Sequence, residues 1–449
     1  MEEKIYLKKP KPLSKEKTAE LIFDYLIKEK NATVEAFFNK TSNEKYLYWD
    51  KTKYLTPIDG LTADESWFVI KQIRQVSSIE TPIKSDSGKF FTWYRPLYTD
   101  KFLREIDMHA GGLFLTEKTS SLQEKDRQKY LARGIVEESI ASSQLEGADT
   151  SRRYAKKMLT EHLRPRTKSE QMIVNNYLVL QKIENDYKNE PLSTYLLQTL
   201  QSQLTEKTLD ETFRPGEFRK DEDDIIVGYD NKIAHVPPKA AFVKKELERL
   251  INYANNDSDF IHPVIKAIQL HFWIGYLHPF PDGNGRLARA IFYWYLFKHG
   301  YWAMGYLPIS AMLKKSQHDY TYAYIYSEQD DNDFTYFYDY NMKKILKSIE
   351  LFKEFIEKRS QENKLLNEKI KNLIPTLNSR QIHTLKYLAS HSDAFTSGTS
   401  YKIMHGVALK TAYRDLKTLN KLGYVYSGQD GKNVLYRPTE KTLTLFQTS

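Results

Sequence analysis

Apolar residues recur at helical spacing in several segments of this chain, and each of these segments predicts a helix. The clearest segment runs from Leu287 to Leu296, directly after a glycine-containing turn, and predicts a buried helix that begins at that turn. Ala412, Leu416 and Leu419 predict a second helix, which ends at Gly423. Further helices are expected at Ile382, Leu385, Leu388 and Ala389, over residues 400–407, and along a connector marked by Ile345, Ile349, Phe352 and Ile356.

Two short β-hairpins interrupt the helical pattern. In the first, Ile225, Ile226 and Val227 form one β-prone run and residues 233–236 form the other, with turn residues 228–231 between them. In the second, residues 424–429 and 433–438 alternate around Asp430-Gly431, a strong two-residue turn signal.

Composition narrows the classes of protein that need consideration. The chain has 449 residues, 41% of them hydrophobic, which is enough for large buried cores and about three domains. It has no cysteine, so disulfides, thiol catalysis and thiolate metal sites are excluded. The first residues lack the apolar core of a signal peptide, and no apolar stretch approaches the length of a membrane span. We therefore expect a cytoplasmic protein with no membrane contact.

One twelve-residue string, HPFPDGNGRLAR at residues 278–289, carries most of the candidate chemistry. Gly283 and Gly285 flank Asn284 in a tight turn at a helix N-terminus, where free backbone N–H groups and the helix dipole favour an anion. Arg286 and Arg289 are three residues apart, so both project from one helix face and suit a di- or triphosphate. In the same string, Asp282 is a hard oxygen ligand for Mg²⁺, and His278 is the natural general base.

His271 and His278 are seven residues apart, but no third ligand of suitable spacing makes them a zinc pair.

The string resembles the signature of the Fic family, His-x-Phe-x-(Asp/Glu)-Gly-Asn-Gly-Arg-x-x-Arg, at every fixed position. Most members of this α-helical family transfer AMP from ATP to a protein hydroxyl. The resemblance implies that His278 deprotonates the target hydroxyl, that Phe280 anchors the loop in the core, and that Asp282 holds Mg²⁺ on the ATP phosphates. It also implies that Gly283, Asn284 and Gly285 form the anion hole, while Arg286 and Arg289 contact the β- and γ-phosphates.

A second string, residues 142–147, resembles the inhibitory motif of the family, (Ser/Thr)-x-x-x-Glu-(Gly/Asn). Here its fixed positions are Ser142, Glu146 and Gly147. Taken alone, the string is also a polar helix end with a glycine cap. The resemblance implies that Glu146 pairs with Arg289, removes a partner of the γ-phosphate and repels the incoming nucleotide.

Two further expectations come from the resemblance. The first hairpin corresponds to the family's "flap", which holds the backbone of the target as an added strand; its target-binding residues would be Ile225, Ile226, Val227 and Gly228. Tyr322 lies where the family has a tyrosine and is a candidate for contact with adenine. Alternatively, the hairpin is a surface hairpin without a binding role, and Tyr322 serves only in packing.

Residues 375–449 hold 10 Lys plus Arg against 4 Asp plus Glu, within a chain of net charge +9. The predicted order of three helices and a hairpin resembles a winged helix-turn-helix, a DNA-binding module. Its outer face would carry Lys410, Thr411, Arg414 and Lys417. Winged helices also serve as protein-docking or dimer modules, and that alternative stays open.

The expected organisation has five parts along the chain. They are an N-terminal extension of unassigned role (1–115), a helical region with the inhibitory motif (116–190), a helical Fic core with a small β-hairpin flap (191–345), a helical connector (346–374) and the winged helix-turn-helix (375–449). The expected function is an autoinhibited protein adenylyltransferase that uses Mg²⁺ and ATP and modifies Ser, Thr or Tyr of proteins, itself included. A homodimer is a family expectation. The alternatives are a DNA-binding regulator or antitoxin-like switch with a nucleotide-sensing domain, and a hydrolase that removes AMP.

Overall fold

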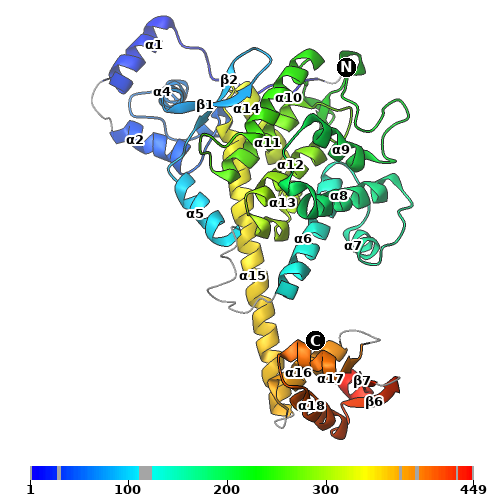
Figure 1. The fold of residues 1–449 in the computed structure, drawn as a ribbon. Coiled ribbons are helices and arrows are strands. Elements are labelled where there is room, and N and C mark those ends of the chain that lie inside the picture. Colours follow the sequence, from blue (N-terminus) through cyan, green and yellow to red (C-terminus); the bar gives the residue numbers. More distant parts are fainter. Residues whose placement is uncertain are drawn as a thin grey trace. The chain divides into compact units, whose positions relative to one another are not determined.

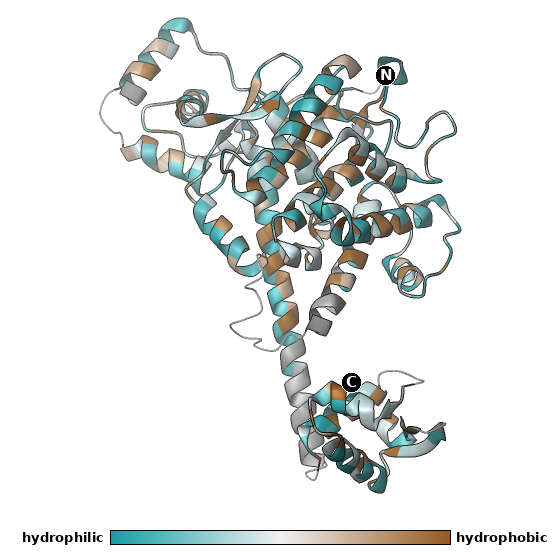
Figure 2. Cartoon of the chain, in the orientation of Figure 1, coloured by the Kyte–Doolittle hydropathy of each residue, from teal (hydrophilic) through white to brown (hydrophobic). Residues whose placement is uncertain are grey.

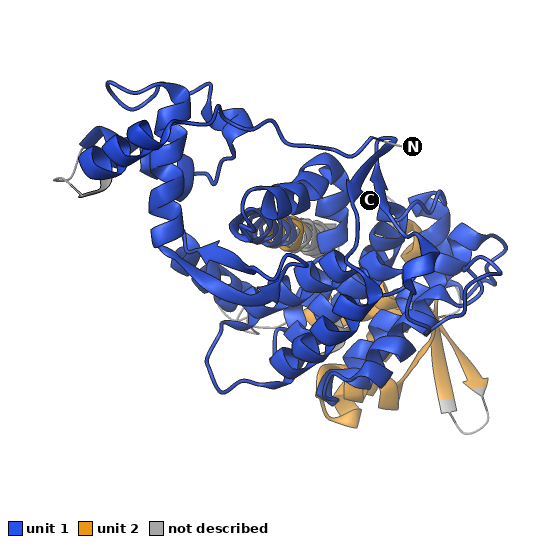
Figure 3. Ribbon diagram, turned by 90° about the horizontal axis from the view of Figure 1, so that it is seen from above, with its two compact units in different colours: residues 1–352 blue, residues 353–449 orange. Residues whose placement is uncertain are grey.

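The computed structural model describes residues 3–27, 32–110, 124–373, 377–389, 394–430 and 433–446. These residues form a mainly helical protein with three small antiparallel sheets, so the predicted fold class is confirmed (Figure 1). The chain divides into two compact units, residues 1–352 and 353–449 (Figure 3). Many helices carry polar and apolar segments side by side in Figure 2, which is typical of helices with one buried face. Among the described residues, no helix combines the length and apolarity that a membrane span requires.

The first unit begins with an extension of short helices and one hairpin. Its core contains the aromatic side chains of Trp49 and Trp67. Lys71 donates to Asp330 at 2.8 Å, and the buried Arg74 guanidinium donates to the hydroxyl of Tyr336 at 3.2 Å. These buried contacts fasten the extension to the later helices. Its elements are α1 (Lys15–Ile22), α2 (Ala32–Phe38), α3 (Trp49–Thr52), α4 (Ala63–Val76), β1 (Ser78–Lys84), β2 (Phe90–Tyr94) and α5 (Thr99–Ala110), with π-helical turns at Phe23–Ile27 and Asn39–Asn43.

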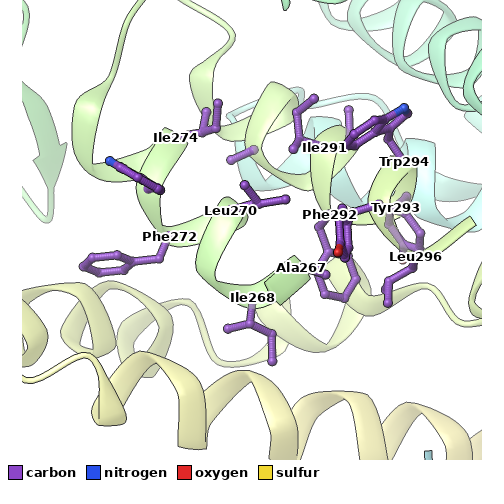
Figure 4. Close-up of a cluster of buried hydrophobic side chains, with 14 of the residues drawn as sticks. Ala267, Ile268, Leu270, Phe272, Ile274, Ile291, Phe292, Tyr293, Trp294 and Leu296 are labelled. Atoms are coloured by element: carbon purple, nitrogen blue, oxygen red, sulfur yellow. The ribbon is translucent and has the colours of Figure 1, made fainter. Parts of the chain in front are cut away.

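The centre of the first unit is the pair α11 (Pro263–Leu277) and α12 (Asn284–Lys298), which pack side by side. Both are apolar on nearly every side, and Figure 4 shows side chains of the two helices converging in one core. The six-residue loop that joins them is therefore anchored at both ends by buried helices. The other elements of the first unit are α6 (Glu124–Leu145), α7 (Arg152–Thr160), α8 (Lys168–Asn185), α9 (Thr194–Thr205), α10 (Ala240–Asn255), α13 (Ile309–Lys315), α14 (Gln317–Gln329), β3 (Val227–Tyr229) and β4 (Lys232–His235), with 3-10 turns at Tyr187–Asn189, Asp221–Asp223 and Trp302–Tyr306. Helix α15 (Thr335–Leu373) belongs to the first unit up to Phe352 and to the second from Lys353.

The second unit contains the predicted helices and hairpin of the tail. Its elements are α16 (Ser379–Ala389), β5 (Thr396–Ser397), α17 (Gly398–His405), α18 (Leu409–Lys421), β6 (Val425–Asp430), β7 (Asn433–Pro438) and α19 (Glu440–Phe446), with strand order β5-β7-β6. Helix α17 begins and ends two residues earlier than predicted, because Ser397 caps its start and Gly406 ends it at a φ of +61°. The turn at Gly431 lies outside the described residues.

Candidate functional site

The imidazole of His278 lies at the end of α11, where the chain turns into the loop. His278 caps α11 in the left-handed conformation, with φ +48° and ψ +57°. Nδ1 of its ring lies 3.2 Å from the carbonyl oxygen of Gly275. Because a carbonyl only accepts, Nδ1 carries the proton and Nε2 is left with a free lone pair. Burial, together with the charge of nearby His235, lowers the pKa of His278 to about 4. The ring is therefore neutral near pH 7 and able to take a proton.

Phe280 and Asn284 hold the loop in place from within. The Phe280 ring is fully buried and stacks on Phe218 at 4.8 Å, as an anchoring residue requires. The amide of Asn284 accepts from the backbone N–H of Phe280 at 2.9 Å and donates to its carbonyl at 2.7 Å. The side chain of Asn284 thus closes the loop on itself, and only its backbone N–H remains for an anion.

The first turn of α12 presents free backbone donors. Gly283 is its N-cap at a φ of +84°, and no side chain caps the helix. Because the first N–H groups of a helix have no partner within it, the N–H groups of Asn284, Gly285 and Arg286 are available to an anion.

Gly285 differs from its predicted role in the turn. It lies inside α12 and needs no left-handed backbone. A Cβ at this position would come within 2.1 Å of Oε1 of Glu146. The glycine therefore makes room for a side chain that comes from another helix.

The two arginines of the string are buried. Arg286 is 1% exposed; its Nη1 donates to the carbonyl of Leu204 at 2.8 Å and its Nη2 to Asp282 at 3.3 Å. Among the residues that the structure describes, none accepts a hydrogen bond from its Nε–H. A buried guanidinium with an unused donor beside an uncapped helix is suited to receive an anion.

Arg289 is held by residues of the 142–147 string, at and just after the end of α6. Its Nε donates to the hydroxyl of Ser142 at 2.8 Å, and its Nη2 donates to the Ser142 carbonyl at 3.0 Å and to Oε1 of Glu146 at 2.9 Å. Burial would raise the pKa of Glu146, but the charges of Arg289 and Arg286 outweigh it and the pKa is lowered. The predicted contact between Glu146 and Arg289 is therefore present. Gly147, at a φ of +91°, lets the chain leave the helix directly after it.

The position of α6 is fixed further by a buried carboxylate. Glu138 accepts a hydrogen bond at 2.9 Å from the backbone N–H of Ser310 on α13 and a further one from its hydroxyl. This contact holds α6 in place about two helical turns before Glu146.

Asp282 is the only residue of the string placed to hold a metal. Its carboxylate is 48% exposed, accepts from the Gly283 N–H at 2.6 Å and contacts Arg286. No group of three or more His, Asp or Glu side chains with a metal-binding arrangement occurs in the part of the chain that the structure describes. A single carboxylate fits Mg²⁺, which is commonly held by one or two carboxylates together with substrate phosphates.

The flap is present, but it is shorter than predicted. Its strands are β3 and β4, and the turn is Asp230-Asn231, where both residues have positive φ as a two-residue hairpin turn requires. Ile225 and Ile226 lie before the first strand, and the side chain of Ile226 is 47% exposed. Gly228, assigned to the turn from the sequence, pairs with Ile233 inside the ladder. The Asp-Asn pair, with its tolerance for left-handed backbone, was the signal for the correct turn.

Tyr322 lies on α14 in an aromatic group beside the flap. Its ring stacks on His318 at 4.3 Å, and His318 in turn contacts Tyr229 of β3 at 6.2 Å. The predicted basic residues of the tail lie on α18, where Lys410, Arg414 and Lys417 are exposed and Thr411 is half-buried.

Two residues of the site received no role from the sequence. Arg219 donates through Nε to the carbonyl of His278 at 2.6 Å and through Nη2 to those of Leu277 and Pro238. Arg219 thereby links the backbone of His278 to that of Pro238, which follows strand β4. Gln201 on α9 donates to the carbonyl of Asp282 at 2.9 Å. A single arginine or glutamine far from the string carries no sequence signal of such contacts.

Comparison with known proteins finds a family similar to the part of the chain that contains the string. The model of the Fic/DOC family matches residues 191–296. The chain is 31% identical over 106 residues to a protein adenylyltransferase Fic of Culex quinquefasciatus, which covers 23% of this chain and 19% of that protein. It is 36% identical over 89 residues to one of Drosophila persimilis, which covers 19% of this chain and 16% of that protein. The chain thus spans less than a fifth of the length of these curated relatives.

Among solved structures, a Fic family protein from Desulfovibrio desulfuricans G20 is similar with a TM-score of 0.49 and 18% identity. That alignment covers 77% of this chain and 98% of that one.

Proposed function

We propose that this chain, whose residues 191–296 match the model of the Fic/DOC family, transfers AMP from ATP to a hydroxyl group of a protein. The observation that carries the proposal is the junction of α11 and α12. There a neutral histidine, an uncapped helix N-terminus and a buried arginine with a free Nε–H occur within nine residues.

The chemistry follows from these groups. Nε2 of His278 takes the proton of the target hydroxyl as its oxygen attacks the α-phosphorus of ATP. The bond between the α-phosphorus and the bridging oxygen breaks, and pyrophosphate leaves with the bonding electrons. Arg286 and the N–H groups of α12 stabilise the negative charge on the phosphates. Positioning and charge stabilisation supply most of the acceleration.

Asp282 is the residue that would hold Mg²⁺, together with the oxygens of the nucleotide. When bound, the ion neutralises phosphate charge. The exposed Asp282 oxygens stay accessible beside Arg286, so the same carboxylate also orients that guanidinium.

We propose further that Glu146 inhibits this AMP transfer. It occupies Nη2 of Arg289 and sets a carboxylate against the start of α12. A phosphate arriving at Arg289 would lose a donor and face a like charge. Nucleotide can still bind with its α-phosphate misplaced, and misplacement alone removes in-line attack.

The flap is the proposed holder of the target. Main-chain pairing to a sheet edge fixes an extended segment without reading its side chains. A target segment held there would present its hydroxyl toward His278, because Arg219 ties the segment after β4 to the His278 carbonyl.

The exposed basic side chains of α18 favour a second, separate proposal for the tail, which is binding to nucleic acid. Ala412, Leu416 and Leu419 are fully buried, so the opposite face of the helix is directed to solvent. That face carries three cations and could contact phosphates.

The reaction is tested with ATP labelled at the α- or the γ-phosphate. The Glu146→Gly variant is incubated with Mg²⁺ and each donor, with itself and with lysate proteins as acceptors. Transfer of α-label that is lost in Glu146→Gly with His278→Ala is the expected result. Transfer of γ-label alone, or loss of AMP from previously labelled protein, would replace the proposed reaction with another.

A further inference from the structure

The outer edge of the flap is filled by a segment of the same chain. Residues 3–5 run parallel to β4, with Lys4 opposite Ile233. The backbone N–H of Ile5 donates to the carbonyl of Ile233 at 2.8 Å, and the N–H of Ile233 donates to the carbonyl of Glu3 at 3.1 Å. The other edge of β4 pairs with β3. Strand β4 is therefore the middle of three, and both its edges are occupied.

Contacts on either side hold this segment in register. The side chain of Gln329, at the end of α14, donates to the carbonyl of Ile5 at 2.8 Å and accepts from the N–H of Leu7 at 2.9 Å. The hydroxyl of Tyr48 donates to the carbonyl of Lys8 at 3.1 Å. The extension, whose role the sequence left unassigned, thus supplies both the segment and one of its anchors.

The occupied strand lies beside the base. His235, at the end of β4, contacts the carbonyl of Tyr276 through Nε2 and the carboxylate of Glu328 through Nδ1, both at 2.8 Å. Tyr276 is two residues before His278. A strand seated along β4 therefore passes the place where a target backbone would have to be held.

We propose that residues 3–5 are an internal competitor for the target, so that a protein substrate must displace them from β4 before it can be modified. This inference rests on the proposed function. It adds a restraint on target binding that is separate from the effect of Glu146 on the nucleotide. Since the contact has only two main-chain hydrogen bonds to β4, a longer target strand can replace it.

Two proline variants test the contact within the full chain. Ile5→Pro removes the N–H that bonds to Ile233. Lys4→Pro is the matched control, because among the described contacts the N–H of Lys4 makes no bond to β4. Both are made with Glu146→Gly, and transfer of α-label to lysate proteins is measured against protein concentration. Ile5→Pro should lower the acceptor concentration at half-maximal rate severalfold, whereas Lys4→Pro should not. Equal rates for the parent, Ile5→Pro and Lys4→Pro would overturn the proposal.

A second measurement does not depend on the reaction. A fluorescent peptide of residues 1–9 is added to the full chain and to a variant that lacks residues 3–7. If the edge is filled internally, the peptide binds the shortened variant at least about tenfold more tightly than the full chain. A peptide with Ile5→Pro should bind neither. If the peptide binds the shortened variant more tightly but no AMP is transferred, residues 3–5 do fill the edge of β4 and the proposed transfer reaction is wrong. If the peptide binds both proteins equally, residues 3–5 do not compete for β4, and the proposed reaction is unaffected.

Discussion

Nη2 of Arg289 donates a 2.9 Å hydrogen bond to Oε1 of Glu146, although 143 residues separate them in the chain. Arg289 is 3% exposed, and its Nε and Nη2 also donate to Ser142, so the end of α6 takes up much of its hydrogen-bonding capacity. A buried arginine paired in this way is costly to leave alone, and its partner can be exchanged only for another anion. Under the proposed function, Glu146 and a nucleotide phosphate would compete for Arg289 at the start of α12.

The space at Gly285 provides a test of this arrangement that needs no substrate. A methyl group there would meet Oε1 of Glu146 at 2.1 Å, so the Glu146 side chain would have to shift and its hydrogen bond to the buried Arg289 would be lost, at a cost of about 1–3 kcal/mol. Gly285→Ala should therefore lower the melting temperature by a few degrees in the parent chain. In a chain that already carries Glu146→Gly, the same change should cost much less. Equal losses in both backgrounds, measured by thermal unfolding, would mean that Glu146 does not occupy this space.

The pKa of His278 sets the pH dependence of transfer. Its pKa lies at about 4, so the ring is neutral and basic at all higher pH values. The charge of Glu146 raises this pKa, and its removal should shift the pKa lower still. The rate of Glu146→Gly at saturating ATP should therefore fall only as the pH drops toward 4 and stay level between pH 6 and 8. An acid limb centred near 6.5, the ordinary value for histidine, would contradict the buried neutral ring.

Arg219 should matter for catalysis without touching the nucleotide. It joins the carbonyls of Leu277, His278 and Pro238, so Arg219→Met leaves buried acceptors without a donor, at about 1–3 kcal/mol. We expect the double variant Glu146→Gly with Arg219→Met to transfer AMP roughly tenfold or more slowly than Glu146→Gly alone. Its affinity for ATP, measured by calorimetry, should stay within about twofold of that of Glu146→Gly. Exposed Arg214 is the matched control, and Arg214→Met should change neither quantity. An unaltered rate in Arg219→Met would show that the base is positioned by other contacts.

The basic face of α18 predicts a salt-dependent interaction. If Lys410, Arg414 and Lys417 contact phosphates, the logarithm of affinity for duplex DNA should fall steeply with the logarithm of salt concentration. Changing all three to glutamine should reduce that slope by about 3, because each phosphate that a cation neutralises adds about 0.9 to it. Affinity and slope would be measured by anisotropy on the full chain. The same slope in both proteins would show that these three side chains do not contact DNA phosphates.

The sequence predicted the parts of the site that lie within one short string. The order of histidine, carboxylate, glycines and arginines in residues 278–289 was enough to predict a helix N-terminus that favours an anion, and α12 begins there. The contact between Glu146 and Arg289 was also predicted, because residues 142–147 resemble a motif of the family whose glutamate pairs with the second signature arginine.

Other contacts between distant segments could not be predicted from the sequence. The space at Gly285 is required by a side chain from α6, and nothing near Gly285 records this. Likewise Arg219 bonds only to carbonyl groups, which every residue has, so its partners leave no pattern in the sequence. The strand made by residues 3–5 is paired through its backbone alone, and its register depends on Gln329, more than 300 residues away. Such pairings depend on tertiary structure rather than on local propensity.

The most direct measurement is the rate of AMP transfer from α-labelled ATP with Mg²⁺, compared among four forms of the full chain. These are the parent, Glu146→Gly, Glu146→Gly with His278→Ala, and Glu137→Gly, a control on the same helix whose carboxylate pairs with Arg152 on the surface. Our account predicts transfer at least about tenfold faster for Glu146→Gly than for the parent, no transfer without His278, and a parental rate for Glu137→Gly. If Glu146→Gly binds ATP yet transfers no faster than the parent, the claim that Glu146 restrains an adenylyltransferase is contradicted.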